Sequence, residues 1–157
     1  MFKCIDKSEF EENKNKNKYK YCFGECESGG SKIYESKLSN TLNVALVSNG
    51  GLSPKINLCN GLYILLVDNH IYIIGIEDEE FKKSFDLKSF VYDVVDYNKK
   101  LIIIGEIDIV VVGYDFNILE KVELNDILSN YFIRDGILYY STMEGVAENE
   151  IVLDWCK

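Results

Sequence analysis

A chain of 157 residues, 47% of them hydrophobic, is long enough for one folded domain, and this apolar content excludes a disordered protein. No apolar run approaches the roughly 20 residues that a membrane span requires. Residues 1–6 carry neither a long apolar stretch nor a small-residue cleavage site, so we expect a cytoplasmic protein that makes no membrane contact.

The net charge of −9 is distributed unevenly along the chain. Residues 1–40 have a net charge of +1, whereas residues 41–157 have nine Lys and Arg against nineteen Asp and Glu, a net charge of −10. Phosphate backbones bind to clustered Lys and Arg, so nucleic acid is a poor partner for the larger part. An acidic surface favours association with a basic protein, or it serves solubility alone.

The first forty residues form a less regular N-terminal part. Residues 8–11 fit a capping box in which Ser8 caps a helical turn. Asn and Lys alternate over residues 13–18 without apolar periodicity, which predicts a solvated loop. Apolar and polar residues alternate on both sides of the turn residues 28–30, so a hairpin is predicted within residues 19–35.

Five cysteines suit a reducing compartment, because an odd number without a secretory leader argues against a disulfide framework. Cys22 and Cys26 have the spacing of half a zinc site, but tetrahedral zinc takes four ligands and the only histidine is His70. The alternative is that both cysteines are small packing residues on one face of a strand. We therefore expect no metal and no cofactor.

Three hairpins are predicted in the last hundred residues, each made of two apolar, β-branched or aromatic runs around a turn. The paired runs are 62–67 with 70–74, 101–104 with 107–112, and 137–140 with 150–153. The first two turns are short, and the third is a longer acidic loop. Apolar runs of this length indicate strands that are covered on both faces.

These segments repeat at a spacing of 37 to 38 residues, since residues 71–75 match 109–113 and Leu101 falls on Leu138. Each unit reads as four strands joined by short links, which is the size of a β-propeller blade. Residues 62–154 therefore resemble WD40-type or related β-propeller blades. The resemblance implies antiparallel meanders in repeats of about 38 residues.

We therefore predict a single all-β domain over residues 1–157, with little helix and a less regular part at 1–40. Two and a half blades do not close a ring, because the smallest rings have four. The alternatives are an incomplete or half propeller, a ring completed by a second copy, and a β-sandwich. The oligomeric state is left open. A half propeller exposes sheet edges and one face, which suits a binding module.

The residues of common catalytic sites are scarce in this sequence. His70 is the only histidine, and its place at a hairpin turn indicates a surface polar residue. Neither a nucleophile elbow, nor a phosphate-binding glycine loop, nor a dinucleotide fingerprint is present. We expect no catalytic residue and no enzyme, although the number of carboxylates leaves a carbohydrate-processing enzyme as a minor alternative.

Acidic residues of the predicted turns, with tyrosines as anchors, are the candidate partner-binding residues. They are Glu77, Asp78, Glu79, Glu80, Glu106, Asp108, Tyr114 and Asp115. For the dense cluster at 77–80, the alternative is a solvated turn that prevents edge-to-edge pairing.

In size and in its incomplete propeller-like repeats, the chain also resembles small bacterial immunity proteins. This resemblance implies an inhibitor that occludes the active site of a basic toxin, such as a nuclease. The alternative is a propeller-like scaffold or assembly module in a cytosolic complex. The two hypotheses differ in the partner, which is one basic toxin in the first and several subunits of a complex in the second.

Overall fold

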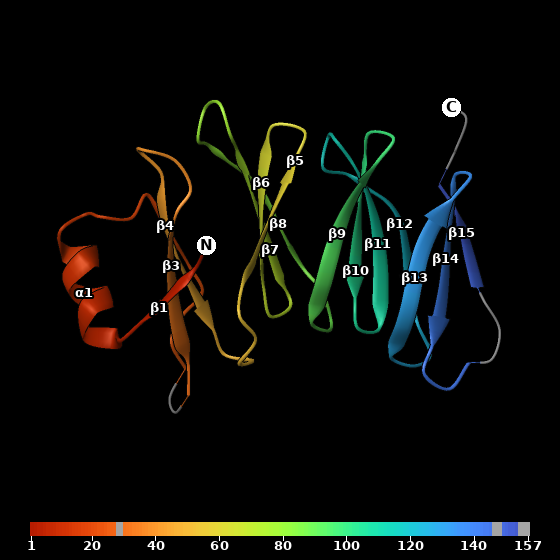
Figure 1. The fold of residues 1–157 in the computed structure, drawn as a ribbon, viewed down its shortest axis with the longest axis horizontal. Helices are drawn as coiled ribbons and strands as arrows, with labels where there is room; N and C mark the ends of the chain where they lie inside the picture. Colours follow the sequence, from red (N-terminus) through yellow and green to blue (C-terminus); the bar gives the residue numbers. More distant parts are fainter. Residues whose placement is uncertain (28–29, 146–148, 154–157) are drawn as a thin grey trace. The chain divides into compact units, whose positions relative to one another are not determined.

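The structure is a computed structural model and describes residues 1–27, 30–145 and 149–153 (Figure 1). The chain divides into two compact units, Met1–Asp86 and Leu87–Lys157. Each unit contains two β-sheets. No helix in the described part of the chain is long and apolar enough to cross a membrane.

The first unit contains an N-terminal sheet with the order β1-β3-β4-β2 and a second sheet with the order β5-β6-β7-β8. The bounds are β1 Lys3–Ile5, α1 Lys7–Asn15, β2 Tyr21–Phe23, β3 Lys32–Lys37, β4 Asn43–Ser48, β5 Lys55–Cys59, β6 Leu62–Val67, β7 His70–Gly75 and β8 Phe81–Asp86. Leu42, Val44 and Leu46 pack with Leu65, Val67 and Ile74 in a core between these two sheets.

The second unit contains a third sheet with the order β12-β11-β10-β9 and a fourth sheet with the order β13-β14-β15. The bounds are β9 Val91–Tyr97, β10 Lys100–Gly105, β11 Asp108–Gly113, β12 Ile118–Glu123, β13 Leu128–Arg134, β14 Ile137–Thr142 and β15 Asn149–Val152. Ile102, Ile104, Ile109 and Val111 pack against Leu138 and Ile151 in its core.

All three predicted hairpins are confirmed, as the antiparallel pairs β6–β7, β10–β11 and β14–β15. Asp68 has φ of 52° in the first of these turns, as its residue type predicts. The strands of the second and third sheets begin 36 to 38 residues apart, which confirms the repeat. The fold class is therefore all-β, and the described residues form blade-like antiparallel meanders with one short helix.

The N-terminal part differs from the predictions. Helix α1 covers Lys7–Asn15, so the solvated loop that was expected from Asn13 begins later. The N-cap is Asp6 and not Ser8, because the carboxylate of Asp6 accepts the backbone N–H of Glu9 at 2.8 Å. Phe10 is the buried anchor of the helix and stacks on Tyr19 at 5.9 Å between ring centroids.

The hairpin predicted within residues 19–35 is wrong, although Ser28 and Gly29 of its turn lie outside the described residues. Strand β2 pairs in parallel with β4, and β3 pairs antiparallel with β4 and β1. The sequence reasoning missed β4, whose Val44–Val47 run is fully buried and therefore takes a central place in the sheet. It also missed β5, the first strand of the second sheet.

Candidate functional site

The predicted cluster at 77–80 lies in the turn between β7 and β8, and the turn itself uses two of its acids. Asp78 accepts the backbone N–H of Glu80 at 3.0 Å and pairs with Lys82. The Glu79 carboxylate accepts hydrogen bonds from the hydroxyls of Ser39 and Thr41, and the bond from Thr41 is 2.7 Å long. These hydrogen bonds lower the pKa of both carboxyls, so both stay ionised.

The other two acids of this turn point to solvent. Glu77 is exposed, and its side chain has no hydrogen bond or ion pair among the described residues. The carboxylate of Glu80 is 64% exposed and lies 3.5 Å from the ammonium of Lys20. An ion pair this exposed contributes little to stability. Glu77 and Glu80 are therefore the acids of this turn that a partner can reach.

Tyr114 and Asp115 lie in the equivalent turn of the third sheet, between β11 and β12. Asp115 accepts the backbone N–H of Asn117 at 3.1 Å, which repeats the role of Asp78. This bond and a second one from the Asn117 side chain lower the pKa of Asp115. The hydroxyl of Tyr114 donates to Asp96 on β9 at 2.5 Å. Tyr114, Asp115 and Asp96 therefore lie at one end of the third sheet.

Glu106 and Asp108 lie at the opposite end of that sheet, near the turn between β10 and β11. Asp108 is 0% exposed, so its prediction as a surface contact is wrong. Its carboxylate accepts the hydroxyl of Ser89 at 2.9 Å, and Ser89 in turn accepts the backbone N–H of Ile107. Asp108 holds the loop before β9 in place, which is a structural role.

A group of aromatic side chains in the first unit was not predicted. In this aromatic cluster the rings of Phe23 and Tyr72 stack at 4.1 Å, and Tyr21 and Phe81 lie 5.7 and 5.8 Å from Phe23. The cluster joins β2 of the N-terminal sheet to β7 and β8 of the second sheet. The hydroxyl of Tyr21 donates to the backbone carbonyl of Glu79 and accepts the N–H of Phe81, which fixes the ring.

The aromatic cluster is partly open to solvent and has acids at both of its ends. At one end of the cluster Phe81 is 42% exposed and directly follows Glu80 in the sequence. The rings of Tyr21, Phe23 and Tyr72 are half-buried. At the other end His70 stacks on Tyr72 and lies 2.6 Å from Asp86, whose side chain is 71% exposed.

Burial raises the pKa of Tyr72, and the negative charges of Asp86 and Asp68 raise it further. We call Glu80, which directly precedes Phe81, and Asp86 the acidic rim of the cluster. Partly exposed rings next to negatively charged carboxylates are an arrangement that suits cationic side chains.

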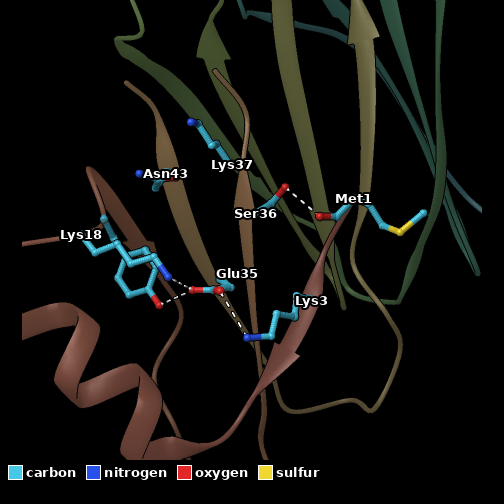
Figure 2. A pocket seen from close by; sticks show the side chains of 8 residues that line it. Met1, Lys3, Lys18, Glu35, Ser36, Lys37 and Asn43 are labelled. Carbon is cyan, nitrogen blue, oxygen red and sulfur yellow. Dashed lines mark hydrogen bonds and ion pairs between the residues drawn. The ribbon is translucent and has the colours of Figure 1, made fainter. Parts of the chain in front are cut away.

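The N-terminal sheet carries a pocket of about 240 Å³ beside helix α1 (Figure 2). It is lined by Met1, Lys3, Lys18, Tyr19, Glu35, Ser36, Lys37 and Asn43. Figure 2 shows the ammonium groups of Lys3 and Lys18 pointing to Glu35 from two sides. Glu35 is therefore the centre of this pocket.

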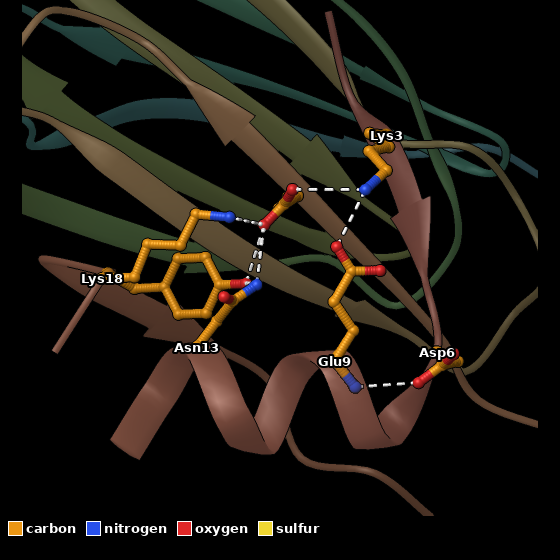
Figure 3. Close-up of polar contacts among 7 residues, drawn as sticks. Lys3, Asp6, Glu9, Asn13 and Lys18 are labelled. Carbon is orange, nitrogen blue, oxygen red and sulfur yellow. Dashed lines mark hydrogen bonds and ion pairs between the residues drawn. The ribbon is translucent and has the colours of Figure 1, made fainter. Parts of the chain in front are cut away.

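The Glu35 carboxylate collects contacts from several elements, and Figure 3 labels three of the residues around it, Lys3, Asn13 and Lys18. It accepts a hydrogen bond from the ammonium of Lys18 at 2.7 Å and another from the hydroxyl of Tyr19 at 2.8 Å. The ammonium of Lys3 on β1 lies 3.8 Å away. Burial alone would raise the pKa of Glu35, but the hydrogen bonds from Lys18 and Tyr19 and the two positive charges lower it. Conversely, burial and the bond to Glu35 raise the pKa of Tyr19 to about 12.

This network fastens the first helix and the following loop to the sheet. The Lys3 ammonium also bonds to Glu9 of α1 at 2.8 Å, and Asn13 of α1 contacts Tyr19 at 3.1 Å. Lys3 therefore links α1 to β1, and the contacts of Asn13, Lys18 and Tyr19 with Glu35 link the helix and the following loop to β3. The carboxylate that lines the pocket, Glu35, already accepts hydrogen bonds from Asn13, Lys18 and Tyr19. We therefore interpret these residues as structural support for the helix.

The cysteines do not pack as the strand alternation indicated. Cys22 on β2 and Cys26 beyond its end are both exposed, so their interpretation as packing residues is wrong. Within the part of the chain that the structure describes, no three His, Cys, Asp or Glu side chains gather as a metal site would require. Cys156 lies outside that part.

The comparisons with known proteins bear on the fold. Neither a protein-family model nor a curated protein matches the chain. The solved structure of the computationally designed Ika4 protein is similar, with a TM-score of 0.54 and 10% sequence identity over 84% of this chain and 88% of that one. At this identity the likeness extends to the fold alone.

Two β-propeller proteins are similar at a lower level. BamB from Moraxella catarrhalis has a TM-score of 0.46 and 11% identity over 74% of this chain and 36% of its own. Hsv2 from Kluyvelomyces marxianus has a TM-score of 0.48 and 10% identity over 73% of this chain and 41% of its own. The chain therefore spans less than half the length of these two proteins.

Proposed function

We propose that this chain is a non-catalytic binding protein, and specifically an immunity protein that neutralises a basic toxin of the nuclease type by occluding its active site. The observation that carries the proposal is the aromatic cluster with its acidic rim. Interfaces bind through a few aromatic anchors that are surrounded by a polar rim, and this face has both parts.

The charge of the whole chain supports a basic partner. The second unit has thirteen Asp and Glu against six Lys and Arg, a net charge of −7, and the first unit has a net charge of −2. A field of one sign accelerates association with a partner of opposite sign and disfavours other acidic proteins. The active site of a nuclease is basic because it binds phosphates, so an acidic inhibitor fits it.

The structure shows which substitutions test this surface without breaking the turn. Asp78 and Glu79 hold the turn, whereas Glu77 and Glu80 are exposed and the ring of Phe81 is 42% exposed. The test variant is therefore Glu77→Lys, Glu80→Lys and Phe81→Ala together. The matched control is Glu11→Lys with Glu25→Lys, two exposed acids of the same unit with the same change of charge.

The experiment is the rescue of bacterial growth when the chain is co-expressed with the toxin that is encoded beside its gene. We expect rescue by the wild type and by the control, and loss of rescue by the triple variant. If the triple variant rescues as well as the wild type, the aromatic cluster is not the binding face. If the wild type does not rescue and several subunits of one complex co-purify with it, the protein is a scaffold.

A further inference from the structure

Asparagine is followed by glycine at two places in the chain, Asn49-Gly50 and Asn60-Gly61. An asparagine in this position is chemically labile, because the next backbone nitrogen belongs to a residue without a Cβ and is unhindered. That nitrogen attacks the side-chain carbon Cγ of the asparagine when the two atoms meet. In a folded chain they meet only where no other bonds hold the reacting groups apart.

The first of these asparagines, Asn49, is held by hydrogen bonds at every reacting group. Its Nδ2 donates to the backbone carbonyl of Glu25 at 3.1 Å, and its Oδ1 accepts the hydroxyl of Ser31. The N–H of Gly50, whose nitrogen would attack, donates to the carboxylate of Asp68 at 3.0 Å. Reaction would break all of these bonds, so the fold protects Asn49.

The second asparagine, Asn60, lies with Gly61 in the turn between β5 and β6, and both residues are exposed. Neither the side-chain amide of Asn60 nor the N–H of Gly61 forms a hydrogen bond to another residue that the structure describes. A Cβ added at Gly61 would meet nothing within 4 Å. The reacting groups of this turn are therefore free to meet when the turn opens locally.

The same turn recurs in the third and fourth sheets and provides two internal comparisons. Asn98-Lys99 joins β9 to β10, and Asp135-Gly136 joins β13 to β14. The φ angles are 42° and 78° at Asn60-Gly61, 46° and 62° at Asn98-Lys99, and 50° and 78° at Asp135-Gly136. The third sheet therefore presents an asparagine that precedes a residue with a side chain. The fourth sheet shows that an aspartate fits the same position.

We propose that Asn60 is a deamidation site. The nitrogen of Gly61 forms a bond to Cγ of Asn60, its proton passes through water to the amide nitrogen Nδ2, and the Cγ–Nδ2 bond breaks with release of ammonia. Water then opens the succinimide ring by breaking one of the two bonds from the Gly61 nitrogen to a ring carbonyl. Cleavage at Cγ gives aspartate, and cleavage at the backbone carbonyl carbon gives isoaspartate.

Either product places a carboxylate where Asn60 had an amide. Asn60 lines a cavity of about 310 Å³ together with Glu77, Asp78 and Lys82, so deamidation adds negative charge beside the turn at 77–80. Aspartate fits this turn as Asp135 fits its own, whereas isoaspartate lengthens the backbone by a carbon within the turn that β5 and β6 flank. The inference does not rest on the proposed function.

The test follows the folded full chain over time at neutral and at mildly alkaline pH. Samples are digested in acid, and the peptides are separated and identified by mass spectrometry. We expect the peptide that contains Asn60 to convert to aspartate and isoaspartate at least about tenfold faster than those that contain Asn49 or Asn98. The rate should rise with pH, because the attacking nitrogen of Gly61 must lose its proton.

Two controls separate the effect of sequence from that of structure. Gly61→Lys copies the Asn98-Lys99 turn and should slow the reaction of Asn60 at least about tenfold. If this variant does not fold, the rate of Asn98 in the wild type gives the same comparison. In urea the bonds around Asn49 are lost, so Asn49 and Asn60 should then react within about threefold of each other.

Equal rates of Asn49 and Asn60 in the folded chain would overturn the inference, because the hydrogen bonds around Asn49 would then not decide which site reacts. An Asn60 amide that survives in the folded chain while the chain in urea loses it would overturn it as well. Reaction of Asn60 in Gly61→Lys at the rate of the wild type would do the same, since the unhindered nitrogen of Gly61 would then have no part in it.

Discussion

Replacing Glu35 by Gln tests whether one ionised carboxylate holds the N-terminal helix on its sheet. Gln keeps the size of the side chain and removes the charge that attracts Lys18 and Lys3. A hydrogen bond to a charged group contributes about 1.5–3 kcal/mol when it is buried. The side chain of Glu35 is 15% exposed but that of Lys18 is 39% exposed, so solvent screens part of this energy.

We therefore expect Glu35→Gln to destabilise the docking of α1 by about 1 kcal/mol, and Glu35→Ala by about 2 kcal/mol. The assay is amide hydrogen exchange of residues 7–16 at neutral pH, which reports the local opening of this helix. A loss of 1.4 kcal/mol corresponds to about tenfold faster exchange. Lys16→Met is the matched control, because the side chains of its ion pair with Glu12 are exposed.

The pH dependence identifies the charge as the cause. The folded protein lowers the pKa of Glu35 from its ordinary value of 4.5, so the stabilisation is present above that value. It is lost as the pH falls through the lowered pKa, since the carboxyl is then protonated in both states. The difference between wild type and Glu35→Gln must therefore shrink as the pH falls below 4.5. A difference that stays constant from pH 7 to the lowest pH at which the protein is folded would refute this reasoning.

Three further results follow from buried or closely packed groups of the second unit. Asp108→Ala should lower the free energy of unfolding in urea by about 2–3 kcal/mol, because Ser89 loses its acceptor; an unchanged midpoint would contradict this. Gly105→Ala should cost about 1–3 kcal/mol, since its Cβ would lie 2.8 Å from a Leu87 methyl and 2.9 Å from the backbone oxygen of Asp108; unchanged stability would contradict this. Burial and the hydrogen bond to Asp93 raise the pKa of Tyr131 to about 12. An ultraviolet titration should therefore show a tyrosine that ionises near pH 12, and the substitution Tyr131→Phe should remove this ionisation. This bond stabilises the fold below about pH 10 and is lost as the pH rises toward 12; a titration curve unchanged by Tyr131→Phe would contradict it.

The repeat and its hairpins were predictable because they depend on local signals. Asp68 in a left-handed conformation and apolar runs on both sides of it specify a hairpin within a dozen residues. The N-terminal sheet was less predictable, because β2 pairs in parallel with β4 across twenty residues. Parallel pairing has no turn signature, so only the burial of Val44–Val47 would have indicated the central strand.

The candidate surface was predictable only in part, for a similar reason. The acids at 77–80 are visible as a charged turn, but their division into turn-holding and outward residues depends on partners such as Ser39 and Thr41. The aromatic cluster joins residues 21–23 to residues 72–81, and nothing in the spacing of these aromatics indicates the contact. Asp108 has the residue type of a surface contact, and only its burial by the neighbouring loop shows otherwise.

The most direct test of the proposed function is the nuclease activity of the toxin encoded beside the gene, measured while the purified chain is added in increasing amounts. An inhibitor that occludes the active site should abolish the activity at about one chain per toxin, and added salt should slow the association. Full activity in the presence of excess chain would contradict the account, whether or not the two proteins bind.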